Sequence, residues 1–212
     1  NKHELHVKNL ILWIRIRVLN VAAFFITHFY SWHYSSLKII KKDSLFFPHD
    51  ITADKNVIYA FWHSKTFVLV PCFRGLNIGI LTLLDWKNII YNKICTHYRY
   101  QTVPVTSLMR ATVRLKKLLE NGHLIGLAVD GPHGPVGVIK PGILFLAKTT
   151  GKPIVAMNVH AKKALRIRSR WDNFEIPLPF TEAVISLSEP LQVTENNVKE
   201  TEERLLSFLK DL

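Results

Sequence analysis

Cysteine and acidic residues are both scarce in this chain of 212 residues. Two cysteines cannot build a disulfide scaffold, so we expect Cys72 and Cys95, which lie among apolar residues, to be buried free thiols in a reducing compartment. Only 16 Asp and Glu residues face 28 Lys and Arg, which gives a formal net charge of +12. This imbalance favours an anionic partner, namely a nucleic acid, an anionic membrane or an anionic substrate.

Several motifs that would identify a reaction class are also absent. The chain has neither a G-x-S-x-G nucleophile elbow nor a G-x-x-x-x-G-K-[ST] phosphate loop, which argues against an α/β-hydrolase and a P-loop enzyme. Its ten histidines show no H-E-x-x-H or Cys-His spacing, so we expect no metal site. No zinc-finger, RNP-like or basic-zipper pattern accompanies the basic residues, so a nucleic-acid-binding protein is the weaker alternative.

The N-terminal region, residues 1–47, is basic and strongly apolar. Residues 10–26 are nearly all apolar, but Arg15, Arg17 and Asn20 interrupt the run. A helix lying in the membrane interface is therefore favoured over one that spans the bilayer. Lys, Arg, Trp and Tyr, which are frequent here, are the residue types that contact lipid headgroups. The alternative is a helix packed on the rest of the protein, with its arginines extended to solvent.

From residue 48 onward the pattern predicts an α/β domain over residues 48–212. Short continuous apolar runs, typical of buried strands, alternate with amphipathic helical segments. This alternation indicates a mostly parallel central sheet flanked by helices, preceded by the N-terminal amphipathic helical membrane anchor. The predicted strands are 57–62, 78–83, 124–129, 153–158 and 183–187. The predicted helices are 64–73, 86–97, 107–120, 142–150 and a tail helix that begins after Asn197.

Three polar side chains follow predicted strands. His63 follows the first strand, Asp85 the second and Asp130 the third. Ligands of open α/β sheets bind at the carboxyl ends of the strands, and a histidine oriented there by a carboxylate forms a general base. The structural alternatives are a helix cap for His63, the N-cap of helix 86–97 for Asp85 and a turn residue for Asp130.

A series of sequence blocks runs through the predicted domain. The blocks are F-W-H-S at 61–64, V-D-G-P-H-G-P at 129–135, K-P-G at 140–142, A-K-T-T-G-K-P-I-V at 147–155, R-S-R-W-D at 168–172 and F-E-I-P-L-P-F at 174–180. Their order resembles the lysophospholipid acyltransferase superfamily over about residues 55–192. It is most similar to a bacterial branch that includes secondary acyltransferases of the lipid A precursor.

The resemblance implies acyl transfer from a thioester to a hydroxyl of a membrane lipid, either a lysophospholipid or a lipid A precursor. His63 would be the general base, with Asp85 and Asp130 as candidate catalytic carboxylates. The donor would be an acyl carrier protein or coenzyme A thioester, with no further cofactor. The protein would bind peripherally or monotopically at the cytoplasmic face of the bacterial inner membrane. Substrate binding falls to Ser64, Arg110, Arg114, Gly131, Pro132, His133 and Gly134.

The sequence departs from the superfamily pattern at the partner of the histidine. The wider superfamily has Asp five residues after its catalytic His, where this chain has Val68. Asp85 lines up with an acidic position of the bacterial branch, and Asp130 with a Glu of the wider superfamily. His133 stands where the branch usually has Arg. A non-catalytic lipid-binding or membrane-remodelling protein of the same fold is therefore the alternative.

Overall fold

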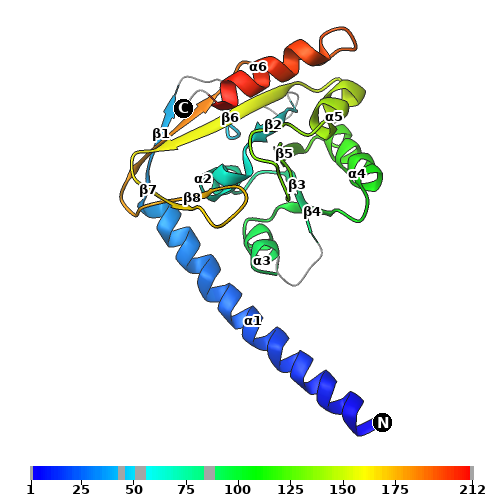
Figure 1. The fold of residues 1–212 in the computed structure, drawn as a ribbon, viewed down its shortest axis with the longest axis vertical. Coiled ribbons are helices and arrows are strands. Elements are labelled where there is room, and N and C mark those ends of the chain that lie inside the picture. Colours follow the sequence, from blue (N-terminus) through cyan, green and yellow to red (C-terminus); the bar gives the residue numbers. More distant parts are fainter. Residues whose placement is uncertain (1, 43–45, 51–55, 84–88, 211–212) are drawn as a thin grey trace.

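The computed structural model describes residues 2–42, 46–50, 56–83 and 89–210 (Figure 1). The strands are β1 (Lys38–Lys42), β2 (Ile58–Phe61), β3 (Ile78–Thr82), β4 (Gln101–Pro104), β5 (Leu124–Ala128), β6 (Ile154–Ala161), β7 (Ala164–Ile167), β8 (Phe174–Pro177) and β9 (Glu182–Leu187). The α-helices are α1 (Lys2–Ser36), α2 (Thr66–Leu69), α3 (Ile89–His97), α4 (Leu108–Glu120), α5 (Gly142–Thr150) and α6 (Val198–Lys210), and two 3-10 helices are η1 (His63–Lys65) and η2 (Val70–Phe73).

Seven of these strands form one sheet in the order β1-β9-β6-β2-β5-β3-β4. Five of its six neighbouring pairs are parallel, and the β6–β9 pair is antiparallel. The prediction of a mostly parallel central sheet is therefore confirmed. Strands β7 and β8 form a separate antiparallel hairpin that leaves the sheet at the carboxyl end of β6.

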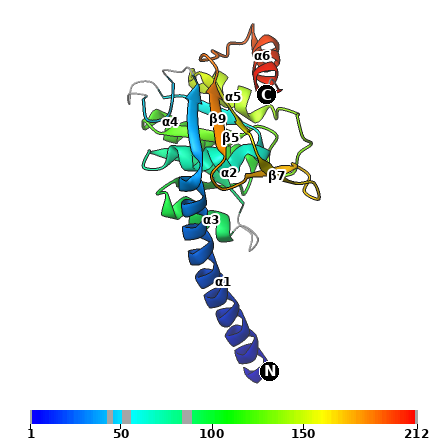
Figure 2. The same ribbon diagram turned by 90° about the vertical axis from the view of Figure 1, so that its left-hand side faces the viewer.

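Alternate side chains of β2 enter two separate cores. Tyr59 and Phe61 lie in a core shared with α1, α2 and α3, whereas Ile58 and Ala60 lie in a core shared with α4, α5 and α6. Figures 1 and 2 show these two sets of helices on opposite sides of the sheet. Since the central strands are buried on both faces, they appear in the sequence as continuous apolar runs.

Helix α1 combines a packed part and a projecting part. Ala23, Thr27 and Tyr30 are buried on the side that faces the domain, and the Tyr30 hydroxyl donates to the carbonyl of Phe67 at 2.6 Å. Toward its N-terminus the helix extends away from the domain (Figures 1 and 2). Over the described ranges, no helix has both the length and the apolar character needed to cross a bilayer.

Strand β1 connects the predicted N-terminal region to the domain. It pairs in parallel with β9, and the Lys38 ammonium donates to the Glu182 carboxylate at 2.8 Å. Residues 38–42 of region 1–47 are therefore part of the sheet, where β1 is an edge strand.

Both cysteines are free thiols. Burial raises the pKa of Cys72 to about 11 and that of Cys95 to about 12. The two thiols are therefore protonated at neutral pH. Cys95 is buried as the sequence predicts, whereas Cys72 is half-buried.

Candidate active site

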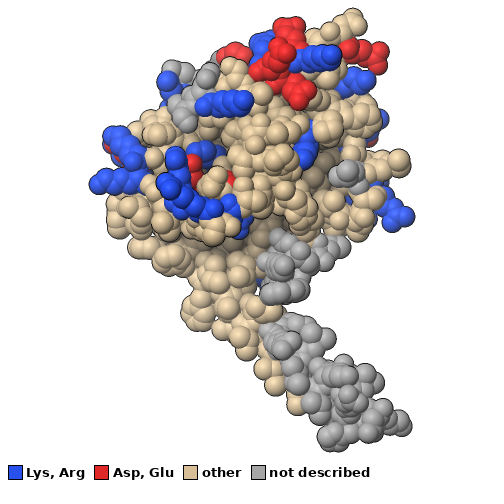
Figure 3. All heavy atoms as spheres, in the orientation of Figure 1, with Lys and Arg blue, Asp and Glu red and all other residues tan. Residues whose placement is uncertain are grey.

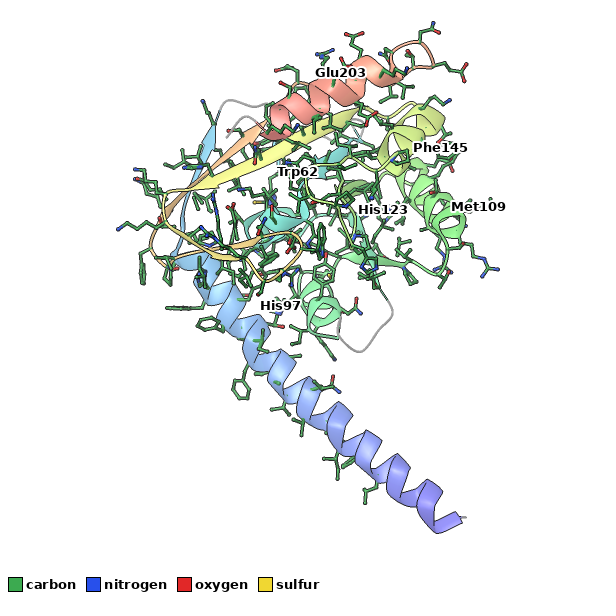
Figure 4. The ribbon with its side chains drawn as sticks, viewed as in Figure 1. Trp62, His97, Met109, His123, Phe145 and Glu203 are labelled. Atoms are coloured by element: carbon green, nitrogen blue, oxygen red, sulfur yellow. The ribbon has the colours of Figure 1, made fainter. Side chains whose placement is uncertain are left out.

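His63 stands directly beyond the carboxyl end of β2, where it begins η1. Its backbone N–H donates to Oδ1 of Asp130 at 2.9 Å, and Asp130 follows the neighbouring strand β5. Trp62, one residue earlier, is buried and donates from its indole nitrogen to the carbonyl of Leu209 at 2.9 Å (Figure 4). The backbone at His63 is thus fixed by strand β2 before it, by the Asp130 carboxylate and by the buried indole of Trp62.

The imidazole ring of His63 contacts a different carboxylate. Its Nδ1 lies 2.6 Å from Oδ2 of Asp172, whose side chain is fully buried. The Arg170 guanidinium donates to both oxygens of Asp172, from Nε and from Nη2, each at 2.9 Å. Burial alone would raise the pKa of Asp172, but the hydrogen bonds from Arg170 and His63 outweigh it and hold that pKa below its ordinary value.

These contacts determine the tautomer of His63. Because Asp172 is ionised at neutral pH, its oxygens only accept hydrogen bonds, so Nδ1 of the neutral ring carries the hydrogen. The lone pair is then on Nε2, the nitrogen free to take a proton. With 28% of its side chain exposed, His63 can be reached by a substrate. The arrangement is that of a histidine general base oriented by a carboxylate.

Two aromatic rings and a glycine shape the surroundings of His63. The Trp171 and Phe174 ring centroids lie 5.3 and 6.5 Å from that of His63. Trp171 packs on Gly134, where an added Cβ would lie 2.6 Å from Cε3 of the indole. Gly134 also has a φ of +70°, which favours glycine. The loop after β5 therefore contacts the indole that lies beside the histidine.

A largely buried ion pair fastens the β7–β8 hairpin beside the site. The Lys65 ammonium donates to Oε2 of Glu175 at 2.7 Å, and these side chains are only 12% and 15% exposed. Nε of Arg166 lies 3.2 Å from the other oxygen of Glu175. Lys65 is two residues after His63, and Glu175 is three residues after Asp172. The His63–Asp172 and Lys65–Glu175 contacts therefore join the same two segments, η1 and the β7–β8 hairpin.

The loop residues predicted to bind substrate lie beside the site but differ in exposure. Pro132 and His133 are exposed, Gly131 is half-buried and Gly134 is buried. The Gly131 N–H donates to the carbonyl of Ala128 at 3.1 Å. A donor to a developing oxyanion from this loop would therefore have to follow Gly131.

The other predicted site residues lie in different parts of the structure. Ser64 is half-buried in η1, next to His63, whereas Arg110 and Arg114 are exposed on α4. Asp85, the other predicted catalytic carboxylate, lies outside the described residues. Asp130 contacts the backbone of His63, and burial raises the pKa of its carboxyl. Within the described ranges, no group of three or more His, Cys, Asp or Glu side chains is placed to hold a metal ion.

Sequence reasoning missed the carboxylate that contacts the imidazole. The R-S-R-W-D block contains Arg170, Trp171 and Asp172, yet it entered the sequence analysis only as one of the blocks that carry the resemblance, and Asp172 was given no role. The available signal was the single acid that ends this basic block, directly after an aromatic residue. Figure 3 shows Lys and Arg side chains gathered over the hairpin, and Arg166, Arg168 and Arg170 are all exposed there.

A comparison with solved structures agrees with this architecture. No protein-family model matches the chain. An uncharacterized protein of Rickettsia prowazekii (strain Madrid E) is 27% identical over 150 residues, which cover 69% of this chain and 68% of that protein. The crystal structure of the 1-acyl-sn-glycerophosphate acyltransferase PlsC from Thermotoga maritima matches 93% of this chain and 82% of its own, with a TM-score of 0.54 and 20% identity. The chain therefore has an acyltransferase-like fold.

Proposed function

We propose that this protein transfers a fatty acyl group from a thioester to a hydroxyl group of a membrane lipid. The observation that carries the proposal is the contact of 2.6 Å between His63 Nδ1 and the buried carboxylate of Asp172. A partly exposed histidine oriented in this way, at the carboxyl edge of a parallel sheet, is suited to general-base catalysis. The likeness in fold to PlsC supports the same class of reaction.

The proposed chemistry needs one base. Nε2 of His63 takes the proton of the acceptor hydroxyl as its oxygen attacks the thioester carbonyl. The tetrahedral intermediate then collapses, the carbon–sulfur bond breaks, and the imidazolium returns its proton to the leaving thiolate. Asp172 stays ionised and stabilises the imidazolium formed between these steps, since the pKa of this carboxyl is held low.

The acceptor proposed is a lipid that carries phosphate. Exposed basic side chains line the hairpin that holds Asp172, and arginine is well suited to phosphate because its planar group donates two parallel hydrogen bonds. A lysophospholipid and a lipid A precursor both fit this chemistry, so the first assay offers both acceptors.

The proposed membrane contact is the solvent-facing side of α1. Its side chains Val21, Phe25, Phe29 and Trp32 are each more than half exposed and lie on the face opposite the buried one. A helix with exposed aromatic and aliphatic side chains can insert them at the boundary between lipid headgroups and acyl chains. This contact would bring the site to its lipid acceptor.

The deciding experiment is acyl transfer by the purified protein and by His63→Ala. Labelled acyl thioesters of coenzyme A and of acyl carrier protein are each offered with a lysophospholipid and with a lipid A precursor. We expect one acceptor to be acylated, and the variant to lose at least about 100-fold in rate because it lacks the general base. His160→Ala removes an exposed histidine of β6 and is the matched control.

A native protein that is inactive with every pair, yet binds anionic vesicles, would contradict the proposal. It would favour the non-catalytic lipid-binding protein instead. Equal activity of His63→Ala and the native protein would exclude His63 as the base.

A further inference from the structure

The solvent-facing side of α4 carries exposed apolar side chains among basic ones. Met109 and Val113 are 80% and 63% exposed and lie one helical turn apart. Arg110, Arg114 and Lys117 are exposed beside them. We call these five residues the α4 patch. Figure 4 shows Met109 on the outer side of its helix, directed away from the sheet.

The fold does not use these side chains. The opposite face of α4 supplies Ala111, Leu115 and Leu119 to the core, and each is at most 3% exposed. Among the described residues, the three cations of the α4 patch form no ion pair. Exposed Met and Arg side chains together are typical of protein interfaces rather than of ordinary surface.

The α4 patch begins near the edge of the sheet that carries His63. Helix α4 begins four residues after β4, and β4 runs parallel to β3, β5 and β2. The carboxyl ends of β4 and β2 therefore lie along one edge. Three interstrand spacings separate them, which is roughly 15 Å. A flexible arm attached to a protein bound at α4 could span a distance of this order.

We propose that the α4 patch is the docking surface for a small acidic carrier protein that delivers the acyl group as a thioester. The inference rests on the proposed acyl transfer and names the partner that would supply its donor. Three cations around two apolar side chains complement an acidic surface with an apolar centre. A bilayer is the less suitable occupant, because the α4 patch has no aromatic side chain, whereas the exposed side of α1 has several.

The test compares two donors, acyl carrier protein and coenzyme A thioesters of one fatty acid, with one acceptor. Arg110→Glu/Arg114→Glu reverses two charges of the α4 patch. Lys199→Glu/Arg204→Glu makes the same change of charge on exposed positions of α6 and is the matched control. We expect the first variant to raise the KM for the carrier-protein donor at least about tenfold more than the KM for the coenzyme A donor, because only the carrier protein would contact the α4 patch. The control variant should leave the KM for both donors unchanged.

A second measurement does not depend on activity. The ¹⁵N-labelled carrier protein is titrated with the native chain and with each variant, and vesicle binding is measured in parallel. Loss of carrier-protein binding in Arg110→Glu/Arg114→Glu alone supports the docking surface, even if no donor is turned over and the proposed acyl transfer fails. In the kinetic test, an equal loss of activity with both donors would overturn the docking surface. In the binding test, so would a loss of vesicle binding instead of carrier-protein binding, or a native chain that binds no carrier protein.

Discussion

Nδ1 of His63 lies 2.6 Å from Oδ2 of Asp172, although 109 residues separate the two along the chain. In the superfamily pattern the carboxylate comes five residues after the histidine. Here that position is Val68, which is 2% exposed in the core. The carboxylate comes instead from the loop between β7 and β8. A histidine–aspartate contact is therefore present, but a different segment of the chain supplies the aspartate.

The first prediction concerns the carboxylate itself. Asp172→Asn should lower kcat by about 100- to 10,000-fold, because an amide can no longer impose the Nδ1–H tautomer or stabilise the imidazolium. Nitrogen-15 chemical shifts of the His63 ring report the tautomer directly. Glu189→Gln, which neutralises an exposed acid, is the control. Native kcat in Asp172→Asn would show that the contact does not serve catalysis.

The second prediction concerns the ion pair that holds the hairpin. Glu175→Gln should lower the free energy of unfolding by about 1–3 kcal/mol, because it leaves the largely buried Lys65 ammonium without its counter-charge. Lys65→Met should lower it by less, because Arg166 still pairs with Glu175. Both should also lower kcat, since the hairpin carries Asp172. A double-mutant cycle measures the coupling, and purely additive effects would contradict a direct pair.

The sequence predicted the centre of the sheet better than its edges. Strands β2, β3, β5, β6 and β9 lie within or close to the predicted ranges, because strands buried on both faces produce continuous apolar runs. Strands β1 and β4 were missed. Each is an edge strand with mostly exposed or half-buried side chains, so neither leaves an apolar run in the sequence.

The sequence predicted only those site residues that directly follow strands of the central sheet. His63 and Asp130 follow strands of a parallel sheet, so topology alone brings them to one edge. Asp172 lies in the loop of a hairpin outside that sheet, and its position depends on how the hairpin folds back over η1. No spacing rule links two segments that meet only in the folded protein.

The third prediction concerns the contact between Gly134 and Trp171. Gly134→Ala places a methyl group against the indole at a φ of +70°, so both strain and overlap oppose it. Gly137→Ala is the matched control, because its φ of +75° imposes similar strain with no atom within 4 Å of the added Cβ. We expect Gly134→Ala to be less stable than the control by about 1–3 kcal/mol. It should also have lower activity, and equal behaviour of the two variants would contradict the prediction.

The fourth prediction concerns pH. Burial raises the pKa of Asp130, so at neutral pH the folded state holds a carboxylate whose ionisation opposes folding. Asp130→Asn keeps an oxygen that can accept from the His63 N–H and removes this charge. The variant should therefore be more stable than the native protein at neutral pH. Its advantage should shrink as pH falls through the raised pKa toward the ordinary value of 3.8.

Urea unfolding of Asp130→Asn and the native protein between pH 4 and pH 8 checks the sign. Asp172→Asn should show the opposite sign, because the pKa of Asp172 is lowered and its stabilising effect is present at neutral pH. A stability difference for Asp130→Asn that does not change with pH would contradict the raised pKa.

The fifth prediction concerns the exposed side of α1. Phe25 and Phe29 are 66% and 60% exposed, one turn apart. If these rings enter a bilayer, Phe25→Glu/Phe29→Glu should weaken binding to anionic vesicles by at least about tenfold, since burying each ring contributes about 2 kcal/mol. Phe145→Glu, which places the same charge on exposed α5, should bind as the native protein does.

Sedimentation with vesicles of anionic and of neutral lipid separates the apolar and electrostatic parts of this binding. Higher salt should weaken only the electrostatic part. If Phe25→Glu/Phe29→Glu instead bound vesicles normally but changed the sedimentation coefficient of the protein in solution, the exposed side of α1 would be a contact between two copies of the chain. The lipid acceptor would then reach His63 by another surface, of which the basic hairpin beside Asp172 is the nearest.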